Sequence, residues 1–397
     1  EILGYNWGTD ESEIDYAALH QNRCKILQKA FERFDTNAQD FQDFVKKQSE
    51  WLEQYALFMT LKTDNLYKNW SEWSSEYRNP QTVALEKYQK KNYNTITFWK
   101  FCQYKFFEQW EDLKNYANSK GVYIIGDISF YVGYDSVDVW AERQLFMMSA
   151  NDTPEYVAAA GPDKYSESGQ VWGNPMYDWD AMKEDNFSWW RKRMRVCREL
   201  FDIVRIDQDK SLSGKWFKGP GRRLVNAINE ELEGVNVVAD DYTSASLLPG
   251  VKKLLAKSGW MGTKVMMFAF DGDPTNEYLP HNYTDSHVVA YIGTHDNETI
   301  VGSFSDKTDY ELAYLYEYLN IENKSQVPNA LIRELYHSTA ELAIVQMQDI
   351  LELGNEARMN YPSTVGHNWR WRMTSKPHRL DNEKIAWIRN IAVVYRR

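Results

Sequence analysis

Apolar positions recur at helical spacing through the first part of the chain. Between residues 14 and 62, apolar side chains three and four positions apart predict two amphipathic helices, the second in the stretch FQDFVKKQSEWLEQYALFMTLK. A polar, tryptophan-rich stretch at 63–83 follows. Residues 95–120 predict a long aromatic helix that stops near Gly121. We therefore expect residues 14–95 to form a mainly helical insertion or subdomain.

The pattern changes after residue 121, where short apolar runs alternate with helical segments. Six runs are short enough for buried strands: VYIIGD, FDIVRID, VNVVADD, KVMMFAF, HVVAYIG and LAIVQMQD. Strands that alternate with helices predict a parallel sheet, and five or six such units favour a barrel over an open sheet. The expected fold class is therefore α/β. We expect one catalytic barrel domain over residues 1–397, with the strands and helices that carry the active site in 121–397.

Four of the apolar segments end in carboxylates: IIGDISFYVGYDSVDVW, FDIVRID, VNVVADD and VVAYIGTHDN. An apolar strand that ends in a charged residue is how a parallel barrel presents catalytic groups at its mouth. Four such strands indicate a carboxylate-based active site, and this arrangement suits chemistry on sugars. The candidate carboxylates are Asp127, Asp135, Asp207, Asp240 and Asp296.

Each of these carboxylates also has a structural explanation. In FDIVRID, the strand period of two puts Arg205 and Asp207 on one face, where the cation holds Asp207 ionised as a nucleophile requires. The alternative is a buried Arg–Asp pair that only stabilises the barrel. The two adjacent aspartates that end VNVVADD are also typical of a turn or a helix cap. Asp296, after His295, could belong to an Asx-type turn, and Asp135 could be only a cap.

Composition and charge narrow the class of protein. A net charge of −11 over 397 residues argues against nucleic acid or an anionic membrane as the main partner, and no apolar run approaches the length of a membrane span. Three widely spaced cysteines, Cys24, Cys102 and Cys197, favour a reducing compartment such as the cytoplasm. The sequence contains no nucleotide-binding, metal-binding or serine-hydrolase motif. No cofactor is therefore implied, and no cluster of ligands indicates a metal site, although a bound metal is not excluded. The aromatic content of 15% provides flat rings that could stack on sugars.

These segments are similar to those of a known family. Their order resembles the α-amylase superfamily. GDISFYVGYDSVDVW, SGQVWGNPMYDW, FDIVRID, GTHDNET and LAIVQMQDILELGNEARMNYPSTVGHNWRWRM resemble the 4-α-glucanotransferases of glycoside hydrolase family 77, also called amylomaltases or disproportionating enzymes. The resemblance extends over about residues 5–397. It implies a (β/α)8 TIM barrel with inserted helical subdomains. It also implies a retaining double displacement that moves an α-1,4-glucan segment between maltooligosaccharides without a cofactor.

The resemblance also implies roles for individual residues. Asp207 would be the nucleophile, with Arg205 as its partner, and Asp240 would be the acid/base. Asp296 would stabilise the transition state, and His295 would bind the sugar at the cleavage site. Five further residues match positions that line the family's substrate groove: Asp127, Asp135, Gln170, Trp172 and Asn174.

Three features depart from the family pattern. At the end of VNVVADD, the family has the pattern Ala-Glu-Asp-Leu-Gly. In this chain Asp240 stands in place of the Glu, and its side chain is one methylene shorter. After Asp207 a substrate-facing loop is replaced, and Gln208 stands where the family has His. The family's first barrel strand would precede Glu1, so we expect a barrel incomplete at that strand. The leading prediction is a 4-α-glucanotransferase of starch or glycogen metabolism. The alternatives are an α-glucan hydrolase, a catalytically impaired α-glucan-binding protein of the same fold, and an excised or recombined piece of it.

Overall fold

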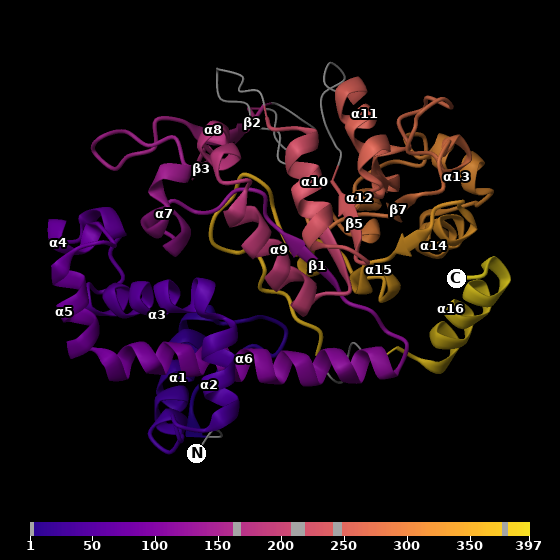
Figure 1. Ribbon diagram of the computed structural model, residues 1–397. Helices are drawn as coiled ribbons and strands as arrows, with labels where there is room; N and C mark the ends of the chain where they lie inside the picture. Colours follow the sequence, from indigo (N-terminus) through magenta and orange to yellow (C-terminus); the bar gives the residue numbers. More distant parts are fainter. Residues whose placement is uncertain (1–3, 162–167, 208–218, 241–247, 375–379) are drawn as a thin grey trace. The chain divides into compact units, whose positions relative to one another are not determined.

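The computed structural model describes residues 4–161, 168–207, 219–240, 248–374 and 380–397 of the chain. These residues fold into two compact units, whose elements are drawn in Figure 1. The first, which we call the central unit, comprises Arg23–Asp163 and Ser168–Gly259. The second, the terminal unit, combines the residues up to Asn22 with Trp260–Arg397. Each unit contains a three-stranded parallel sheet of its own.

Helices form the first part of the central unit. They are the second part of α1 (Tyr16–Phe31), whose first residues up to Asn22 belong to the terminal unit, and then α2 (Gln39–Lys47), α3 (Ser49–Asp64), η2 (Trp70–Glu72), α4 (Ser75–Arg78), α5 (Val83–Lys91) and α6 (Tyr93–Ser119). Aromatic side chains hold these helices together, because Phe41 of α2 lies buried in one cluster with Phe98, Phe101 and Tyr104 of α6. Helix α3 also packs along α6 (Figure 1). Much of the chain's aromatic content is therefore helix packing.

The long aromatic helix predicted from the sequence is confirmed as α6, and Gly121 follows it with a φ of +74°. The second predicted amphipathic helix is wrong in its continuity, because α2 ends at Lys47 and α3 begins at Ser49. The residue between them, Gln48, has a buried side chain that accepts a hydrogen bond from Nε1 of Trp51 at 2.7 Å and donates one to Glu199 at 2.9 Å. Apolar periodicity continues across this break and does not reveal it.

The parallel sheet of the central unit has the order β1-β4-β5, formed by Ile125–Ile128, Ile203–Ile206 and Asn236–Ala239. Helices α9 (Ser188–Leu200) and α10 (Arg222–Glu231) precede and follow β4 and pack against each other. The apolar runs therefore form buried parallel strands, as the sequence predicts. Since parallel strands end at the same edge, the residues after β1, β4 and β5 come together.

The rest of the central unit consists of short elements. Strands β2 (Val157–Ala160) and β3 (Gln170–Pro175) form an antiparallel ribbon. The segment that carries the groove candidates Gln170, Trp172 and Asn174 is therefore a strand over Gln170–Pro175. The other elements are α7 (Val137–Ala141), η3 (Arg143–Leu145), α8 (Trp179–Glu184) and α11 (Leu248–Ser258).

The parallel sheet of the terminal unit has the order β6-β7-β8, formed by Gly262–Val265, Val288–Tyr291 and Leu342–Ile344. All of β7 is buried, as a strand covered on both faces should be. The run KVMMFAF is a strand only up to Val265 and continues as η4 (Met266–Phe268). The remaining elements are η5 (Pro280–Asn282), α12 (Ile300–Ser305), α13 (Ala313–Leu319), η6 (Lys324–Gln326), α14 (Val327–His337), α15 (Met347–Ile350), η7 (Asn355–Ala357) and α16 (Asn382–Tyr395).

The fold class is mixed α/β, with parallel strands connected through helices in both units. The sheets that the described residues form are small, and no closed barrel is found among them. Each unit has its own core: in the terminal unit, strand residues such as Ala290 pack with Leu331 and Leu335 of α14. None of the helices in the described parts of the chain is long and apolar enough to cross a membrane.

Candidate active site

Arg205 lies at the centre of the candidate site in the central unit. Its guanidinium forms two ion pairs of 2.6 Å, one from Nη1 to Oδ2 of Asp127 and one from Nη2 to Oδ2 of Asp240. Strand register explains both contacts. Asp127 lies opposite Arg205 on β1, and Asp240 directly follows β5 on the other side of β4. Two carboxylates from neighbouring strands therefore converge on one cation.

The contact with Asp240 is buried, and the contact with Asp127 is open. Arg205 is 7% exposed and Asp240 is 8% exposed, whereas the side chain of Asp127 is 44% exposed. Burial alone would lower the pKa of the Arg205 guanidinium, but the carboxylates of Asp240 and Asp127 outweigh it and raise this pKa above its ordinary value. The guanidinium therefore stays charged, and the buried pair it forms with Asp240 is of the kind that is costly to break.

Asp207 is placed by the same sheet. It directly follows β4, and its backbone N–H donates a hydrogen bond to the carbonyl oxygen of Ile128 at 3.2 Å, which extends the pairing of β1 with β4. Its carboxylate contributes to the raised pKa of Arg205, as expected for two side chains that the strand period directs to one face. The replaced loop that begins at Gln208, and the second aspartate of VNVVADD, Asp241, lie outside the described residues.

Asp135 connects two segments of the central unit. Its carboxylate accepts hydrogen bonds from Nζ of Lys62 at 2.6 Å and from the backbone N–H of Trp70 at 3.2 Å. Lys62 is buried and also donates to two backbone carbonyls. The helix cap considered for Asp135 is made by the next residue, Ser136, which accepts from the N–H of Val139. Asp135 thus has a structural role that its sequence context did not predict.

The three groove candidates of β3 lie on one face of that strand. Gln170, Trp172 and Asn174 alternate with the exposed residues Val171 and Gly173 and are themselves half-buried. Oε1 of Gln170 accepts a hydrogen bond from Nε1 of Trp172 at 3.3 Å. The strand thus presents two amides and one indole on the same side, which is a set of groups able to bind hydroxyls and a flat apolar face.

In the terminal unit, His295 and Asp296 lie in a tight turn beyond β7. Asn297 closes this turn, because its Oδ1 accepts from both the N–H and the hydroxyl of Thr294, at 2.9 and 3.0 Å. The carboxylate of Asp296 does not close the turn and instead contacts two other side chains. Its Oδ1 accepts from Nδ2 of Asn360 at 2.5 Å and lies 3.6 Å from Nε2 of His295. The side chain that closes this turn is therefore that of Asn297, which accepts from Thr294 three positions earlier, and it does not form the Asx-type turn considered for Asp296.

Two residues that the sequence did not single out hold this turn. Arg358 donates from Nη2 to the carbonyl oxygen of Asp296 at 2.8 Å and from Nε to that of Asn360 at 2.9 Å. The N–H of Asn360 donates to the carbonyl oxygen of His295 at 3.1 Å. Both residues belong to the stretch ARMN, inside the longest segment that resembles the family. The resemblance of this stretch to the family could have drawn attention to Arg358 and Asn360. The spacing of these residues in the sequence does not show that they contact the turn of His295 and Asp296.

A buried carboxylate supports the element that follows the turn. Asp349 is 1% exposed, and its Oδ1 accepts from the N–H of Ile300, the first residue of α12, at 2.8 Å. Burial raises the pKa of Asp349 to about 6, although the bond from Ile300 acts in the opposite direction. The turn that carries Asp296 is thus connected through α12 to an acid that ionises at mildly acidic pH.

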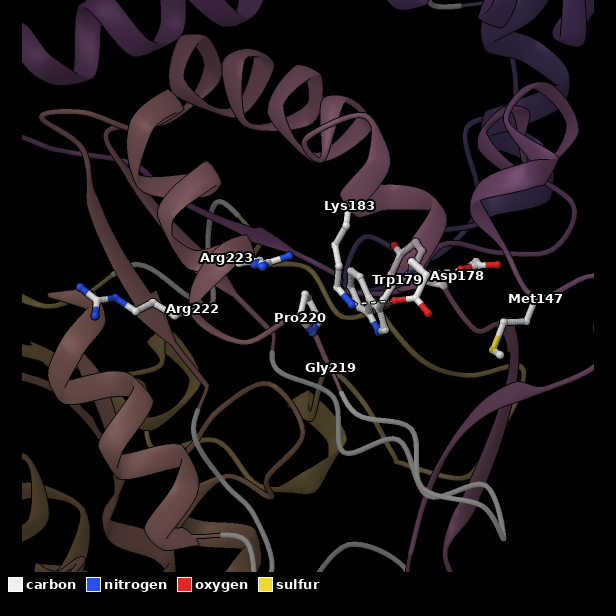
Figure 2. A pocket seen from close by; sticks show the side chains of 10 residues that line it. Met147, Asp178, Trp179, Lys183, Gly219, Pro220, Arg222 and Arg223 are labelled. Atoms are coloured by element: carbon white, nitrogen blue, oxygen red, sulfur yellow. Dashed lines mark hydrogen bonds and ion pairs between the residues drawn. The ribbon is translucent and has the colours of Figure 1, made fainter.

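A pocket of about 560 Å³ lies elsewhere in the central unit, between the starts of α8 and α10 (Figure 2). Trp179 and Lys183 line one part of it, and Pro220 and Arg223 line another. The ammonium of Lys183 pairs with Asp180 at 2.8 Å. None of the candidate residues lines this pocket, so its volume does not argue for or against the site around Arg205.

The candidate residues support carboxylate chemistry. In the described parts of the chain, no group of three or more His, Cys, Asp and Glu side chains is arranged to hold a metal ion. The central unit brings together Asp127, Asp207 and Asp240 around Arg205, and the terminal unit presents Asp296 beside His295. Carboxylates that are held ionised can act as nucleophiles, and carboxylates that exchange protons can act as general acids and bases.

Comparison with known proteins identifies sequences and structures similar to the whole chain. The sequence pattern of a family described as 4-alpha-glucanotransferase matches residues 4–377. A 4-alpha-glucanotransferase of Clostridium butyricum is 37% identical, over 99% of this chain and 83% of its own length. One of Thermus thermophilus is 36% identical, over 97% and 81%. The solved structure of amylomaltase from Streptococcus agalactiae in complex with acarbose has a TM-score of 0.92 and 33% identity, over 100% of this chain and 82% of its own.

Proposed function

The chain belongs to the 4-alpha-glucanotransferase family, and from that premise we propose that it transfers α-1,4-glucan segments between maltooligosaccharides by a retaining double displacement. The observation that carries the proposal is the cluster around Arg205, where three strand-end aspartates surround one buried cation. Retaining glycosidic chemistry requires two carboxyl groups close to each other, one as nucleophile and one as acid/base. Asp207 and Asp240, at the ends of neighbouring strands, are the pair that fits these roles.

In the first half of the reaction, the carboxylate of Asp207 attacks the anomeric carbon of the donor sugar. The bond from that carbon to the glycosidic oxygen breaks, and Asp240 gives its proton to the departing oxygen. In the second half, Asp240 takes the proton from the hydroxyl of an acceptor glucan, which displaces Asp207 and restores the glycosidic bond. Arg205 keeps the nucleophile ionised between turnovers.

The proton-transfer role of Asp240 sets a condition on Arg205. An ion pair with a guanidinium favours the ionised carboxylate, whereas the first half of the reaction needs a protonated one. Arg205 bonds Oδ2 of Asp240 at 2.6 Å, so we propose that the proton is carried by the other oxygen, Oδ1. Because Oδ1 is buried, proton transfer also requires this atom to become accessible to the glycosidic oxygen of the bound glucan. Asp296 stabilises the charge that develops on the sugar, and His295 binds its hydroxyls. Asp127, Asp135, Gln170, Trp172 and Asn174 complete the substrate groove.

We further propose that the parallel strands of both units belong to one (β/α)8 barrel domain, with residues 14–95 as a helical insertion and the barrel elements in 121–397. The order of strands and helices in each unit supports this arrangement, as does the TM-score of 0.92 with the S. agalactiae amylomaltase. That neighbour's complex with acarbose supports α-glucans as the substrate class. A cytoplasmic location is part of the proposal and rests on the wide spacing of the three cysteines.

Incubation with maltotriose and separation of the products by chromatography tests the proposal. A transferase produces glucose together with a ladder of longer oligomers. Products that are only shorter than maltotriose would show a hydrolase instead. No change in the sugar, with glucan binding still measured by calorimetry, would identify a binding protein. Asp112→Asn is a matched control for carboxylate variants, because Asp112 lies on an exposed position of α6.

A further inference from the structure

Trp369 of the terminal unit has an unusual backbone conformation next to His295. Its φ is +62°, in the left-handed region that bulky residues rarely adopt. The centroids of its ring and the His295 ring are 5.0 Å apart, with their planes at 40°. Contacts therefore run from Trp369 to His295, and from His295 to the carboxylate of Asp296 at 3.6 Å. Strained residues of this kind cluster at binding and catalytic sites.

The surrounding structure holds Trp369 in this conformation. Its N–H donates to the carbonyl oxygen of Met359 at 2.6 Å, and its carbonyl oxygen accepts from the hydroxyl of Tyr16. The residues that follow it pair with a segment near the start of the chain, because Glu13 and Trp371 form an antiparallel bridge. The backbone N–H of Ile14 also donates to Arg370 within this pairing. The strained conformation is thus fixed from both sides.

The loop before Trp369 is closed by its own hydrogen bonds. Oδ1 of Asn368 accepts from the N–H of Tyr361 at 3.0 Å, and its Nδ2 donates to the carbonyl oxygen of Thr364 at 3.1 Å. Ser363 and Gly366 of this loop also have positive φ. These hydrogen bonds close the loop, and the indole of Trp369 directly after it lies beside His295.

Packing does not explain this arrangement. The tryptophans that serve the core, such as Trp70, Trp140 and Trp190, are completely buried, whereas Trp369 is 44% exposed. Its indole N–H has no hydrogen-bond partner among the residues that the structure describes. A strained, half-exposed ring with an available donor contributes little to a core, but it is suited to bind a ligand that offers an apolar face and hydroxyls.

We propose that Trp369 contacts the glucosyl residue on which Asp296 acts, stacking its ring on the sugar and donating its N–H to a sugar hydroxyl. The inference rests on the proposed function, because the ligand it names is the α-glucan of that reaction. Asn360 and His295 border the same carboxylate, so the indole, the imidazole and the amide together form one binding surface in the terminal unit.

Two substitutions separate the parts of this contact. Trp369→Ala removes both the stacking ring and the donor, and we expect it to raise the dissociation constant for maltoheptaose about tenfold to thirtyfold. Trp369→Phe keeps a ring beside His295 but removes the N–H, and we expect a rise of about threefold to tenfold. Binding is measured by calorimetry in the Asp207→Asn background, where the glucan is not consumed. Tyr310→Ala is the control, since Tyr310 is 90% exposed in the same unit and should leave binding unchanged.

A double-mutant cycle with His295→Ala tests whether Trp369 acts only by orienting His295. Direct contact predicts that Trp369→Ala still weakens glucan binding severalfold when His295 is absent. No further weakening in that background, together with unchanged binding by Trp369→Phe, would overturn the inference. Circular dichroism and melting temperature establish that each variant is folded. Wild-type protein that binds maltoheptaose but does not transfer would overturn the proposed function alone, and the binding cycle would still decide the role of Trp369.

Discussion

The two units hold their candidate carboxylates in different ways. In the central unit, strand register alone brings Asp127 and Asp240 onto Arg205, so the cluster is part of the sheet. In the terminal unit, Asp296 leaves β7 and is held by Asn360, which lies 64 positions further along the chain. The first cluster depends on buried charge and the second on an amide and backbone bonds. The difference predicts that breaking the buried ion pair of Arg205 should lower stability, whereas removing the amide of Asn360 should lower activity more than stability.

The largest effect should come from the nucleophile. Asp207→Asn removes the attacking carboxylate, so we expect transfer from maltotriose to fall on the order of 10⁴-fold, as in other enzymes that lose a nucleophile. Binding of maltoheptaose and the melting temperature should change little, because the backbone bond to Ile128 remains. Initial rates and calorimetry measure both effects, with Asp112→Asn as the control. A loss of folding in Asp207→Asn would show that this carboxylate mainly stabilises the sheet.

Breaking the buried ion pair should have the next largest effect. Arg205→Met leaves Asp240 buried beside an apolar side chain, which should lower the free energy of unfolding by about 3–5 kcal/mol. Arg195→Met is the matched control, because Arg195 also pairs with two carboxylates but its side chain is 43% exposed, and its loss should cost less than about 1 kcal/mol. Urea unfolding compares the two. Equal losses would refute the distinction between buried and open pairs.

The buried acid of the terminal unit should give a dependence on pH. Its pKa is about 6 in the folded protein, above the ordinary value of 3.8, so the folded state binds more protons between these values and loses stability as pH rises through them. Asp349→Asn removes this titration. The free energy of unfolding of the variant, relative to that of the wild type, should therefore rise by about 2 kcal/mol between pH 4 and pH 7. Urea unfolding at several pH values measures the gap, and a gap independent of pH would contradict the assignment.

The smallest of these effects should arise at Asn360. Asn360→Ala removes the amide that bonds Asp296, and we expect transfer to fall about tenfold, as for the loss of one hydrogen bond to a charged group. The free energy of unfolding should change by less than it does for Arg205→Met. Asn329→Ala is the control, because Asn329 accepts a hydrogen bond from Lys384 in the same unit. The contrary outcome is that Asn360→Ala lowers the free energy of unfolding without lowering the rate per folded molecule. In that case the residues around Asp296 would mainly stabilise the fold, as the ion pairs of Arg205 do.

The sequence predicts the parts of the fold that depend on periodicity. Apolar runs predict the strands that carry Arg205 and Asp240 and the buried strand before His295, and helical spacing predicts α6. Family resemblance adds the roles of these residues, which stay predictions. The break at Gln48 was missed because it depends on a side-chain bond to Glu199, 151 positions away.

Contacts between elements are where sequence reasoning is incomplete. Arg205 was expected to pair with Asp207 on its own strand, but its ion pairs at 2.6 Å join it to Asp127 and Asp240. The period of one strand gives the face on which a side chain lies and does not give the register of its neighbours. The contact of Asn360 with Asp296 likewise depends on how a distant loop folds back, which no local pattern encodes.

The clamp on Trp369 has a consequence for the timing of folding. Tyr16 and Trp369 are 353 positions apart in the chain, so their hydrogen bond must wait until synthesis has passed residue 369. At roughly 5–20 residues per second, this interval is on the order of tens of seconds. Until then, the hydrogen bonds from Tyr16 to Trp369 and from Ile14 to Arg370 cannot form. The surface that we propose to bind the glucan is therefore completed only as one of the last steps of synthesis and folding, and activity should appear later than the central sheet.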